Sequence, residues 1–490
     1  MEALLTSPPP VVPIAPARAV KYRYINSSYV LLSAAIGLST GLYCYYQYHF
    51  FDYESISFGA MAFATATLIF GINKTIPIRE IASFMFVMQL LLFAALDYRY
   101  FHPIGLGMMK IKSEVYFNYM IPAVVSMLIG LWLPLFKLKI SINEVFDKLK
   151  IHRVQNLRLG LVFVLAGYFF DTITRLGINI PGFEFVVVLL VNLRFVGAFC
   201  IWFTDGRYAI WVILLVLLPF LIQTAAGGIF IEIFVWGFFI YAYIANRAKF
   251  PWVLTVVMFV VGGAFATVLQ AAKSEYREKT WNTSANSMSS NKKLTMLGDL
   301  IVKHATHLSP LQLQLAGVGM AYRLNQGLIS AKVLNNVPRN KPFAEGEYFK
   351  NELLGVFLPR FLHPNKPNVG DHDKFYYFTN WRLARATAMN VDVMCDGYVN
   401  FGFVGGIIYS FCFGVLINYF FHLMLRYSLT YPTIILWVPI ILSFAMRAGN
   451  ESYMIVNNIA KAGVFLALIY WFLISVMKLT LSIEVKKAKP

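Results

Sequence analysis

The sequence predicts an all-α, polytopic helical membrane protein with about twelve transmembrane helices and one large extracytoplasmic loop that contains amphipathic helices. Hydrophobic residues make up 58% of the 490 residues and charged residues only 13%, which excludes an ordinary soluble enzyme. The apolar residues form stretches about as long as the ~20 residues that a helix needs to cross a bilayer. One long polar interval, residues 272–395, interrupts these stretches.

The predicted elements follow one another in five parts. A proline-rich cytoplasmic tail, 1–27, lacks the apolar core of a cleaved signal peptide. Transmembrane helices 1–9 occupy 28–271, the extracytoplasmic loop 272–395 is expected to hold the active site, helices 10–12 occupy 396–481, and a cytoplasmic tail, 482–490, follows. The spans are expected near 28–47, 56–72, 80–97, 115–136, 157–173, 183–203, 208–225, 229–246, 250–271, 396–423, 431–447 and 459–481.

The distribution of lysine and arginine predicts the orientation. Basic residues precede the first span and follow the second, fourth, sixth, eighth, tenth and last spans, so these loops share one side. Short loops rich in Lys and Arg face the cytoplasm, so both termini are expected inside and the 272–395 loop outside. The outside loop 98–114 is an exception, because it carries Arg99, Lys110 and Lys112.

The formal charge of +18 indicates binding to anionic membrane lipids and to an anionic substrate. No DNA- or RNA-binding motif is present, so nucleic acid is not an expected partner. The four cysteines have no zinc-type spacing, and no cofactor or metal site is expected.

The loop contains apolar residues at helical spacing from Leu294 to Leu334, which predicts two or three amphipathic helices at the membrane surface. A further short helix is expected from Tyr348 to Phe357, before Pro359.

Arginines and lysines in and beside this loop are the candidate anion-binding groups, because the guanidinium fork fits diphosphate oxygens. Arg382 and Arg385 share a face if their segment is helical. The alternative for each is a solvated surface charge or, for Arg194 inside the sixth span, a structural pair with an acid such as Glu232. The candidates are Arg194, Arg323, Arg360, Lys366, Arg382, Arg385 and Arg447.

Three other residues are candidates for proton transfer or substrate contact. His372 titrates near neutral pH and suits a general base, although it also fits a solvent-exposed loop. Asp396 opens the tenth span, where its carboxylate is expected to orient a loop arginine or to accept a hydrogen bond from an acceptor hydroxyl. Asn400 follows one helical turn later, so both can face one cavity. The alternative for Asp396 is a helix cap.

Two stretches carry a resemblance to a known family. Leu358–Pro367, LPRFLHPNKP, resembles the basic-proline segment in the large periplasmic loop of Wzy-type O-antigen (oligosaccharide repeat unit) polymerases. Asp396–Gly406, DGYVNFGFVGG, resembles the acidic-x-Tyr-x-Asn-Phe-Gly segment that opens their next span, with Asp in place of Glu. Arg323, in the run Ala321–Arg323, and Arg447 also stand where such enzymes often carry arginines.

This resemblance implies a glycosyltransferase of the bacterial cytoplasmic (inner) membrane. It would transfer a growing glycan from undecaprenyl diphosphate onto a lipid-linked repeat unit at the outer membrane face, without a metal ion if arginines neutralise the leaving diphosphate. Arg360, Asp396 and His372 are then the expected catalytic residues, and the remaining candidates bind substrate. A chain-length regulator and a flippase are the protein partners that the resemblance implies.

Three other functions stay open at the level of the sequence. An O-antigen ligase shares the architecture and the need for arginines. A lipid-glycan flippase or secondary transporter would distribute charges along its spans and show internal repeats. A scaffold protein would not need an organised external loop.

Overall fold

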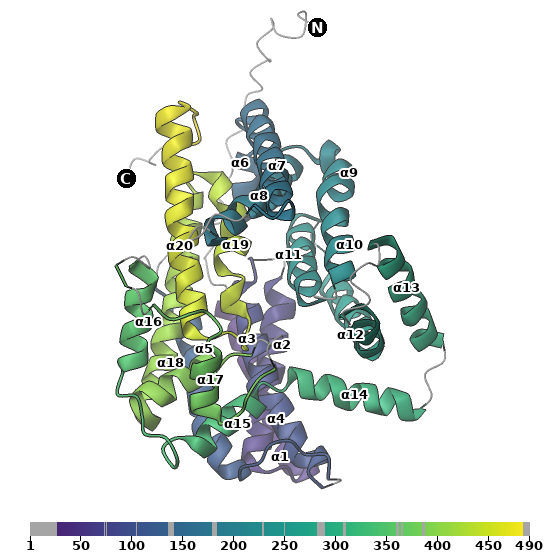
Figure 1. Ribbon diagram of the computed structural model, residues 1–490, viewed down its shortest axis with the longest axis vertical. Coiled ribbons are helices and arrows are strands. Elements are labelled where there is room, and N and C mark those ends of the chain that lie inside the picture. Colours follow the sequence, from purple (N-terminus) through teal and green to yellow (C-terminus); the bar gives the residue numbers. More distant parts are fainter. Residues whose placement is uncertain are drawn as a thin grey trace, which may run out of the picture.

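The computed structural model describes residues 27–72, 74, 76–103, 105–135, 142–178, 184–227, 230–248, 250–281, 290–306, 310–358, 362–363, 366–384, 387 and 389–483. Every regular element within these residues is a helix (Figure 1). Ten of the described helices are long and apolar enough to cross a membrane. The prediction of an all-α polytopic membrane protein is therefore confirmed.

The first half of the chain is built from helices that follow the predicted spans closely. In the third span, π-helical turns join α3 and α4 into one continuous helix, Ile78–Phe101. The helices are α1 (Ser27–Tyr48), α2 (Asp52–Gly71), α3 (Ile78–Val87), α4 (Phe93–Leu96), α5 (Ser113–Trp132), α6 (Ile142–Lys148), α7 (Arg153–Arg175), α8 (Glu184–Thr204), α9 (Ala209–Val212), α10 (Leu218–Gly227), α11 (Phe230–Ala248) and α12 (Trp252–Trp281).

The second half begins with the helices of the 272–395 interval and ends with the last spans. Three helices, α13 to α15, lie where amphipathic helices were predicted, and α16 lies at the predicted short helix. The helices are α13 (Ser290–Thr306), α14 (Pro310–Leu324), α15 (Gly327–Asn336), α16 (Glu347–Phe357), α17 (His372–Thr379), α18 (Val393–Ser428), α19 (Val438–Leu442) and α20 (Ser452–Trp471).

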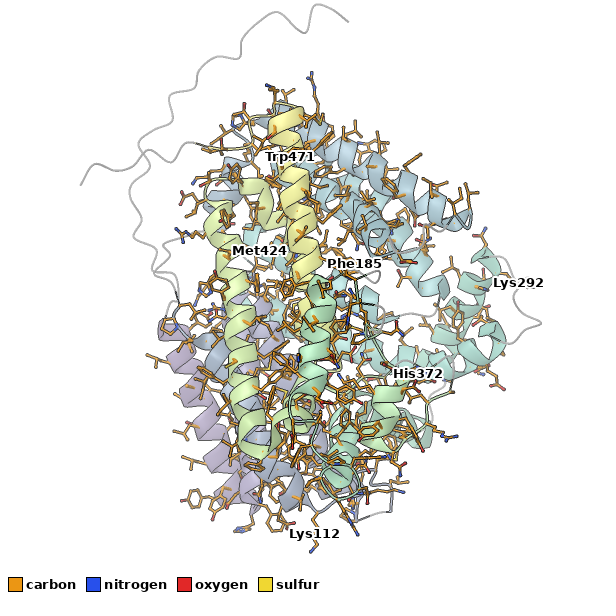
Figure 2. All side chains as sticks on the ribbon, turned by 60° about the vertical axis from the view of Figure 1, so that its left-hand side comes forward. Lys112, Phe185, Lys292, His372, Met424 and Trp471 are labelled. Carbon is orange, nitrogen blue, oxygen red and sulfur yellow. The ribbon has the colours of Figure 1, made fainter. Side chains whose placement is uncertain are left out.

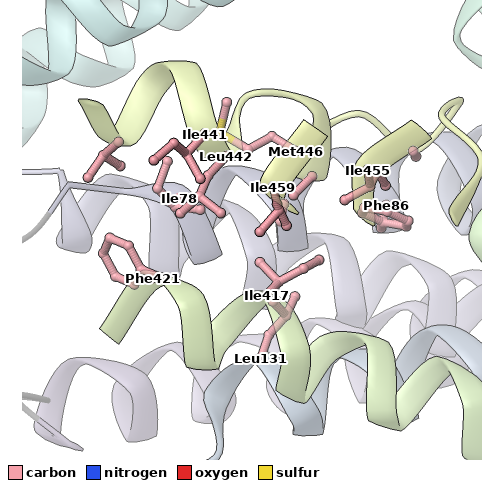
Figure 3. Packing of buried hydrophobic residues seen from close by; sticks show 14 of the residues in the cluster. Ile78, Phe86, Leu131, Ile417, Phe421, Ile441, Leu442, Met446, Ile455 and Ile459 are labelled. Atoms are coloured by element: carbon pink, nitrogen blue, oxygen red, sulfur yellow. The ribbon is translucent and has the colours of Figure 1, made fainter. Parts of the chain in front are cut away.

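Glycines allow the closest helix pairs to approach one another. A Cβ atom on Gly414 of α18 would lie 2.2 Å from the Met127 carbonyl oxygen of α5, and one on Gly59 of α2 would lie 2.7 Å from the Gly37 carbonyl oxygen of α1. Small residues are what membrane helices need for such contacts. Around these pairs, buried aliphatic and aromatic side chains of α3, α5, α18, α19 and α20 form one core (Figure 3).

The predicted span at 431–447 is not a single helix. The chain there forms a 3₁₀ segment, Pro432–Trp437, then α19 and another short 3₁₀ turn. Pro432 and Pro439 have no N–H to donate, which breaks the helical ladder. Irregular backbone is tolerated at membrane depth only inside protein. Here the segment is buried, and Asn458 Nδ2 donates to the carbonyl oxygens of Ile440 (3.1 Å) and Ile441 (2.9 Å).

The tenth span does not begin at Asp396 as predicted. α18 bends sharply at Gly402, whose φ of 71° suits only glycine. A Cβ on Gly397 would lie 2.7 Å from the Tyr409 ring, and one on Gly406 would lie 2.9 Å from the Tyr398 nitrogen. The first arm of α18, residues 393–401, therefore folds back along the second arm, and Asp396 packs beside the long arm instead of at its start.

The helices α16 and α17 lie against the spans α18 and α20, and α15 lies beside α17 (Figure 1). α14 joins α15 to α13, which packs with α12 away from this group. Part of the 272–395 interval thus forms a layer on the last spans.

Candidate functional site

One buried ammonium group meets three carboxylates where α16, α17, α18 and α20 come together. Lys374 Nζ contacts Glu352 Oε1, lies 2.9 Å from Asp396 Oδ1 and 3.5 Å from Glu451 Oε2. All four residues are at most 6% exposed. We call these four residues the Lys374 cluster.

The position of Lys374 follows from the short helix that carries it. Asp371 caps the start of α17 by accepting a hydrogen bond from the Asp373 nitrogen (2.9 Å), and Asn380, with φ 51°, ends the helix in the left-handed conformation. Within these eight residues, Lys374 and Phe378 are four apart and share the buried face. The helix therefore directs its lysine into the protein together with its aromatic residues.

The acids of the cluster also bind backbone groups. Glu451 Oε1 accepts a hydrogen bond from the Gly370 nitrogen (2.8 Å), which ties the start of α20 to the loop before α17. Asp396 Oδ2 accepts from the Ser452 nitrogen (2.8 Å), the first residue of α20. Asn400 continues the network, because its Oδ1 accepts from the Phe349 nitrogen of α16 (3.0 Å) and its Nδ2 donates to the Asp396 carbonyl (2.9 Å).

Three carboxylates and one ammonium leave the cluster with an excess of negative charge in a medium of low polarity. Burial raises the pKa of Glu352 to about 7, and burial likewise raises the pKa of Glu451. Burial disfavours the ammonium form of Lys374, but the Asp396, Glu352 and Glu451 carboxylates outweigh it and raise its pKa well above the ordinary value. The cluster can therefore hold an extra proton on a carboxyl group near neutral pH.

Of the sequence candidates, Asp396 and Asn400 belong to this network, and both are buried. Asp396 pairs with Lys374 rather than with the expected loop arginine, and its expected contact with an acceptor hydroxyl stays a prediction. His372 lies on the same helix as Lys374 but on its exposed face (Figure 2).

The candidate cations lie on separate elements. Arg323 is exposed at the end of α14, Lys366 Nζ donates to the Leu358 carbonyl (3.0 Å), and the half-buried Arg447 guanidinium lies 5.4 Å from the Phe444 ring centre. Arg360 and Arg385 fall outside the described residues. No single cationic pocket is therefore assembled from the described candidates.

α17 ends at Thr379 and Arg382 lies on non-helical backbone, while Arg385 lies outside the described residues, so the clamp of Arg382 and Arg385 stays a prediction. The Arg382 guanidinium covers the Tyr376 ring at 5.0 Å.

Arg194 forms a structural ion pair, as the sequence left open, but its partner is Asp171. Its Nη1 lies 3.2 Å from Asp171 Oδ2, across the α7–α8 contact. The alternative partner, the Glu232 side chain, lies outside the described residues. The Asp171 pair explains how an arginine is accommodated within a span.

Sequence reasoning did not single out Lys374 or Glu352. A signal was present for Lys374, because its spacing puts it on the same helix face as the apolar residues Phe375 and Phe378. Among the described residues, no group of three His, Cys, Asp or Glu side chains is arranged to hold a metal ion.

No protein-family model matches the chain, and no curated protein and no solved structure is detectably similar to it.

Proposed function

We propose that the chain is a Wzy-type polysaccharide polymerase, a glycosyltransferase that extends a lipid-linked glycan at the outer face of the bacterial cytoplasmic membrane. The Lys374 cluster is the observation that supports this most. In it, Lys374, which follows the LPRFLHPNKP stretch in the chain, pairs with Asp396 of the DGYVNFG stretch, and the Gly370 nitrogen bonds Glu451.

In the proposed reaction, an acceptor hydroxyl oxygen bonds to the anomeric carbon of the donor glycan, and the bond from that carbon to diphosphate breaks. The hydroxyl proton passes to a base, for which exposed His372 remains the candidate. The electron pair leaves with undecaprenyl diphosphate, whose charge arginines such as Arg360 would neutralise. In this scheme Asp396 is a positioning residue, because it holds Lys374 and with it α17.

The decisive experiment gives purified protein undecaprenyl-diphosphate-linked repeat units and measures the length of the products. Longer lipid-linked chains support a polymerase. Transfer to a lipid A core only would indicate a ligase instead. Unmodified substrate that moves across the membrane of a proteoliposome would indicate a transporter.

Arg360→Ala is expected to nearly abolish polymer at normal protein level, since loss of one charged donor to the diphosphate costs about 2–4 kcal/mol in the transition state. Arg360→Lys should recover activity only in part, because an ammonium cannot make the bidentate contact. Exposed Lys350 of α16 provides the matched control, and Lys350→Ala should polymerise normally. Polymer of wild-type length from Arg360→Ala would exclude Arg360 from the reaction.

A transporter is the second candidate, and one observation favours it. Arg79 and Glu80 are both fully buried at the start of α3, within a span, and Glu80 Oε1 accepts a hydrogen bond from Tyr29 (3.0 Å). Buried charges within spans often mark transport pathways. The vesicle arm of the experiment above separates the two functions.

A further inference from the structure

Three cation–aromatic pairs form one surface on α15, α17 and the residues that follow them. Lys332 Nζ lies 4.8 Å from the Trp381 ring centre, Lys341 Nζ lies 4.6 Å from that of Tyr377, and the Arg382 guanidinium lies 5.0 Å from that of Tyr376. We call these six residues the basic–aromatic surface. Tyr376 is exposed on the side of α17 away from buried Lys374, whereas Tyr377 and Trp381 are half-buried.

The cations of this surface are not neutralised by neighbouring acids. Among the described residues, no carboxylate forms a salt bridge with Lys332, Lys341 or Arg382. Lys374, in contrast, meets three. Each cation instead lies over a ring, which leaves its remaining N–H donors available. The surface is therefore electropositive.

An open groove of about 690 Å³ lies on the 98–114 loop. The groove is lined by His102, Lys110 and Lys112, with Glu114 as the acid among its lining residues. Burial first, and then the charge of Lys110, lower the pKa of Lys332, so the two ammonium groups are close enough to repel each other. This loop is also the exception to the charge asymmetry of the short loops.

Rings and cations in alternation fit one class of ligand. The C–H face of a sugar packs against an aromatic ring, and a carboxylate on that sugar accepts hydrogen bonds from an adjacent ammonium or guanidinium. A neutral glycan would leave the cations unused, and a free phosphate would leave the rings unused. A linear chain of acidic sugars uses both.

We propose that the basic–aromatic surface binds an acidic glycan chain that carries sugar carboxylates. This inference rests on the proposed function for its orientation, because it makes the substrate of the polymerase an acidic repeat unit held on the outer side of α17.

The test measures binding of three probes to the full-length protein in lipid nanodiscs by calorimetry. The probes are a galacturonic acid hexamer, a neutral glucose hexamer and inorganic diphosphate. We expect the galacturonate hexamer to bind at least about tenfold more tightly than the glucose hexamer, and more tightly than diphosphate. Equal binding of the two hexamers, or tighter binding of diphosphate, would overturn the proposal.

Variants locate the site. Arg382→Gln and Tyr376→Leu change exposed side chains and should each weaken galacturonate binding at least about tenfold. Lys350→Gln, which removes an exposed cation from neighbouring α16, should leave binding unchanged. Thermal unfolding confirms that the variants fold. Wild-type affinity in both surface variants would refute the site.

The two proposals fail separately. A chain that binds galacturonate but does not extend lipid-linked units would refute the polymerase and leave the surface standing. A chain that extends lipid-linked units but ignores the acidic probe would refute only the surface.

Discussion

At Lys374 three carboxylates meet one ammonium group, and the number of protons on the acids decides the net charge that the protein must bury. Glu352 is the acid whose pKa is raised to about 7, so its proton is the one that changes near neutral pH. Each acid also holds a different element, α16, α18 or the start of α20, against α17. Protonation of this cluster is thus linked to the packing of the 272–395 interval on the last spans.

The first prediction concerns pH. The pKa of Glu352 is raised from 4.5 to about 7. Protonated Glu352 therefore contributes to the free energy of unfolding, and this contribution is fully present below pH 4.5. That contribution, about 3 kcal/mol, is lost as the pH rises through about 7. Burial also raises the pKa of Glu451, so its proton contributes to stability with the same pH dependence. Thermal unfolding in detergent should show a melting temperature that falls between pH 4.5 and pH 7.5.

Glu352→Gln should flatten this dependence, since glutamine keeps the shape and carries no titrating proton. The matched control is Glu347→Gln, which changes an exposed acid of the same helix and should keep the wild-type slope. A Glu352→Gln profile that falls as steeply as the wild type would show that the proton resides elsewhere.

The second prediction removes the ammonium group. Lys374→Met leaves three buried carboxylates without their cation, which should destabilise the protein by about 3–5 kcal/mol. Because α17 is only eight residues long, we expect α17 and its flanking loops to unfold before the rest of the protein. Limited proteolysis should cleave the 362–384 region at lower temperature than in the wild type. Lys350→Met, on the exposed face of α16, should resist proteolysis as the wild type does.

At the scale of elements, hydropathy predicted the helices well because apolar length is a one-dimensional property of the sequence. It failed where backbone geometry decides. Pro432 and Pro439 break a stretch as apolar as a span, and Gly402 folds the start of α18 back on itself. Neither the fold-back nor the meeting of Lys374 with Glu352 and Glu451 can be derived from spacing, because the partners come from separate helices.

The third prediction tests the bend in α18. Gly402 has φ 71°, and a Cβ there would meet only the Phe343 ring, at 3.9 Å. Gly402→Ala should therefore cost backbone strain without a steric clash, about 1–2 kcal/mol, and lower the melting temperature. Gly463→Ala in α20, where a Cβ meets nothing within 4 Å, is the control and should be neutral or slightly stabilising. Equal melting temperatures of the two variants would contradict the bend.

For the whole molecule, the contacts place the ends of the helices on two sides. The Ser452 nitrogen bonds Asp396, and the Ile483 nitrogen donates to the Thr430 carbonyl (2.9 Å), so α18 and α20 run parallel. The broken segment between them, residues 429–451, must then run back alongside α18, where the eleventh span was predicted. Gln155 at the start of α7 bonds the Thr480 carbonyl (2.9 Å), so that helix begins on the same side.

The start of α1 lies on this side too. The Tyr29 ring, near the beginning of α1, packs against Trp132 at the end of α5 (6.2 Å), and Arg79 at the start of α3 lies over both Trp132 (4.7 Å) and Phe421 near the end of α18 (5.7 Å). Loops that the lysine and arginine count assigned to the cytoplasm are therefore grouped in space. This grouping agrees with the prediction that these loops share one side of the membrane.

The fourth prediction fixes that orientation. With Cys412, the exposed cysteine, replaced by serine, single cysteines are introduced as Ser287→Cys and Lys486→Cys. A membrane-impermeant maleimide added to intact cells should label Ser287→Cys at once and Lys486→Cys only after permeabilisation, because short basic loops stay in the cytoplasm while a long loop is translocated regardless of charge. The reverse pattern would place α16, α17 and the Lys374 cluster on the cytoplasmic side, where a polymerase that uses outward-facing lipid-linked glycans has no substrate.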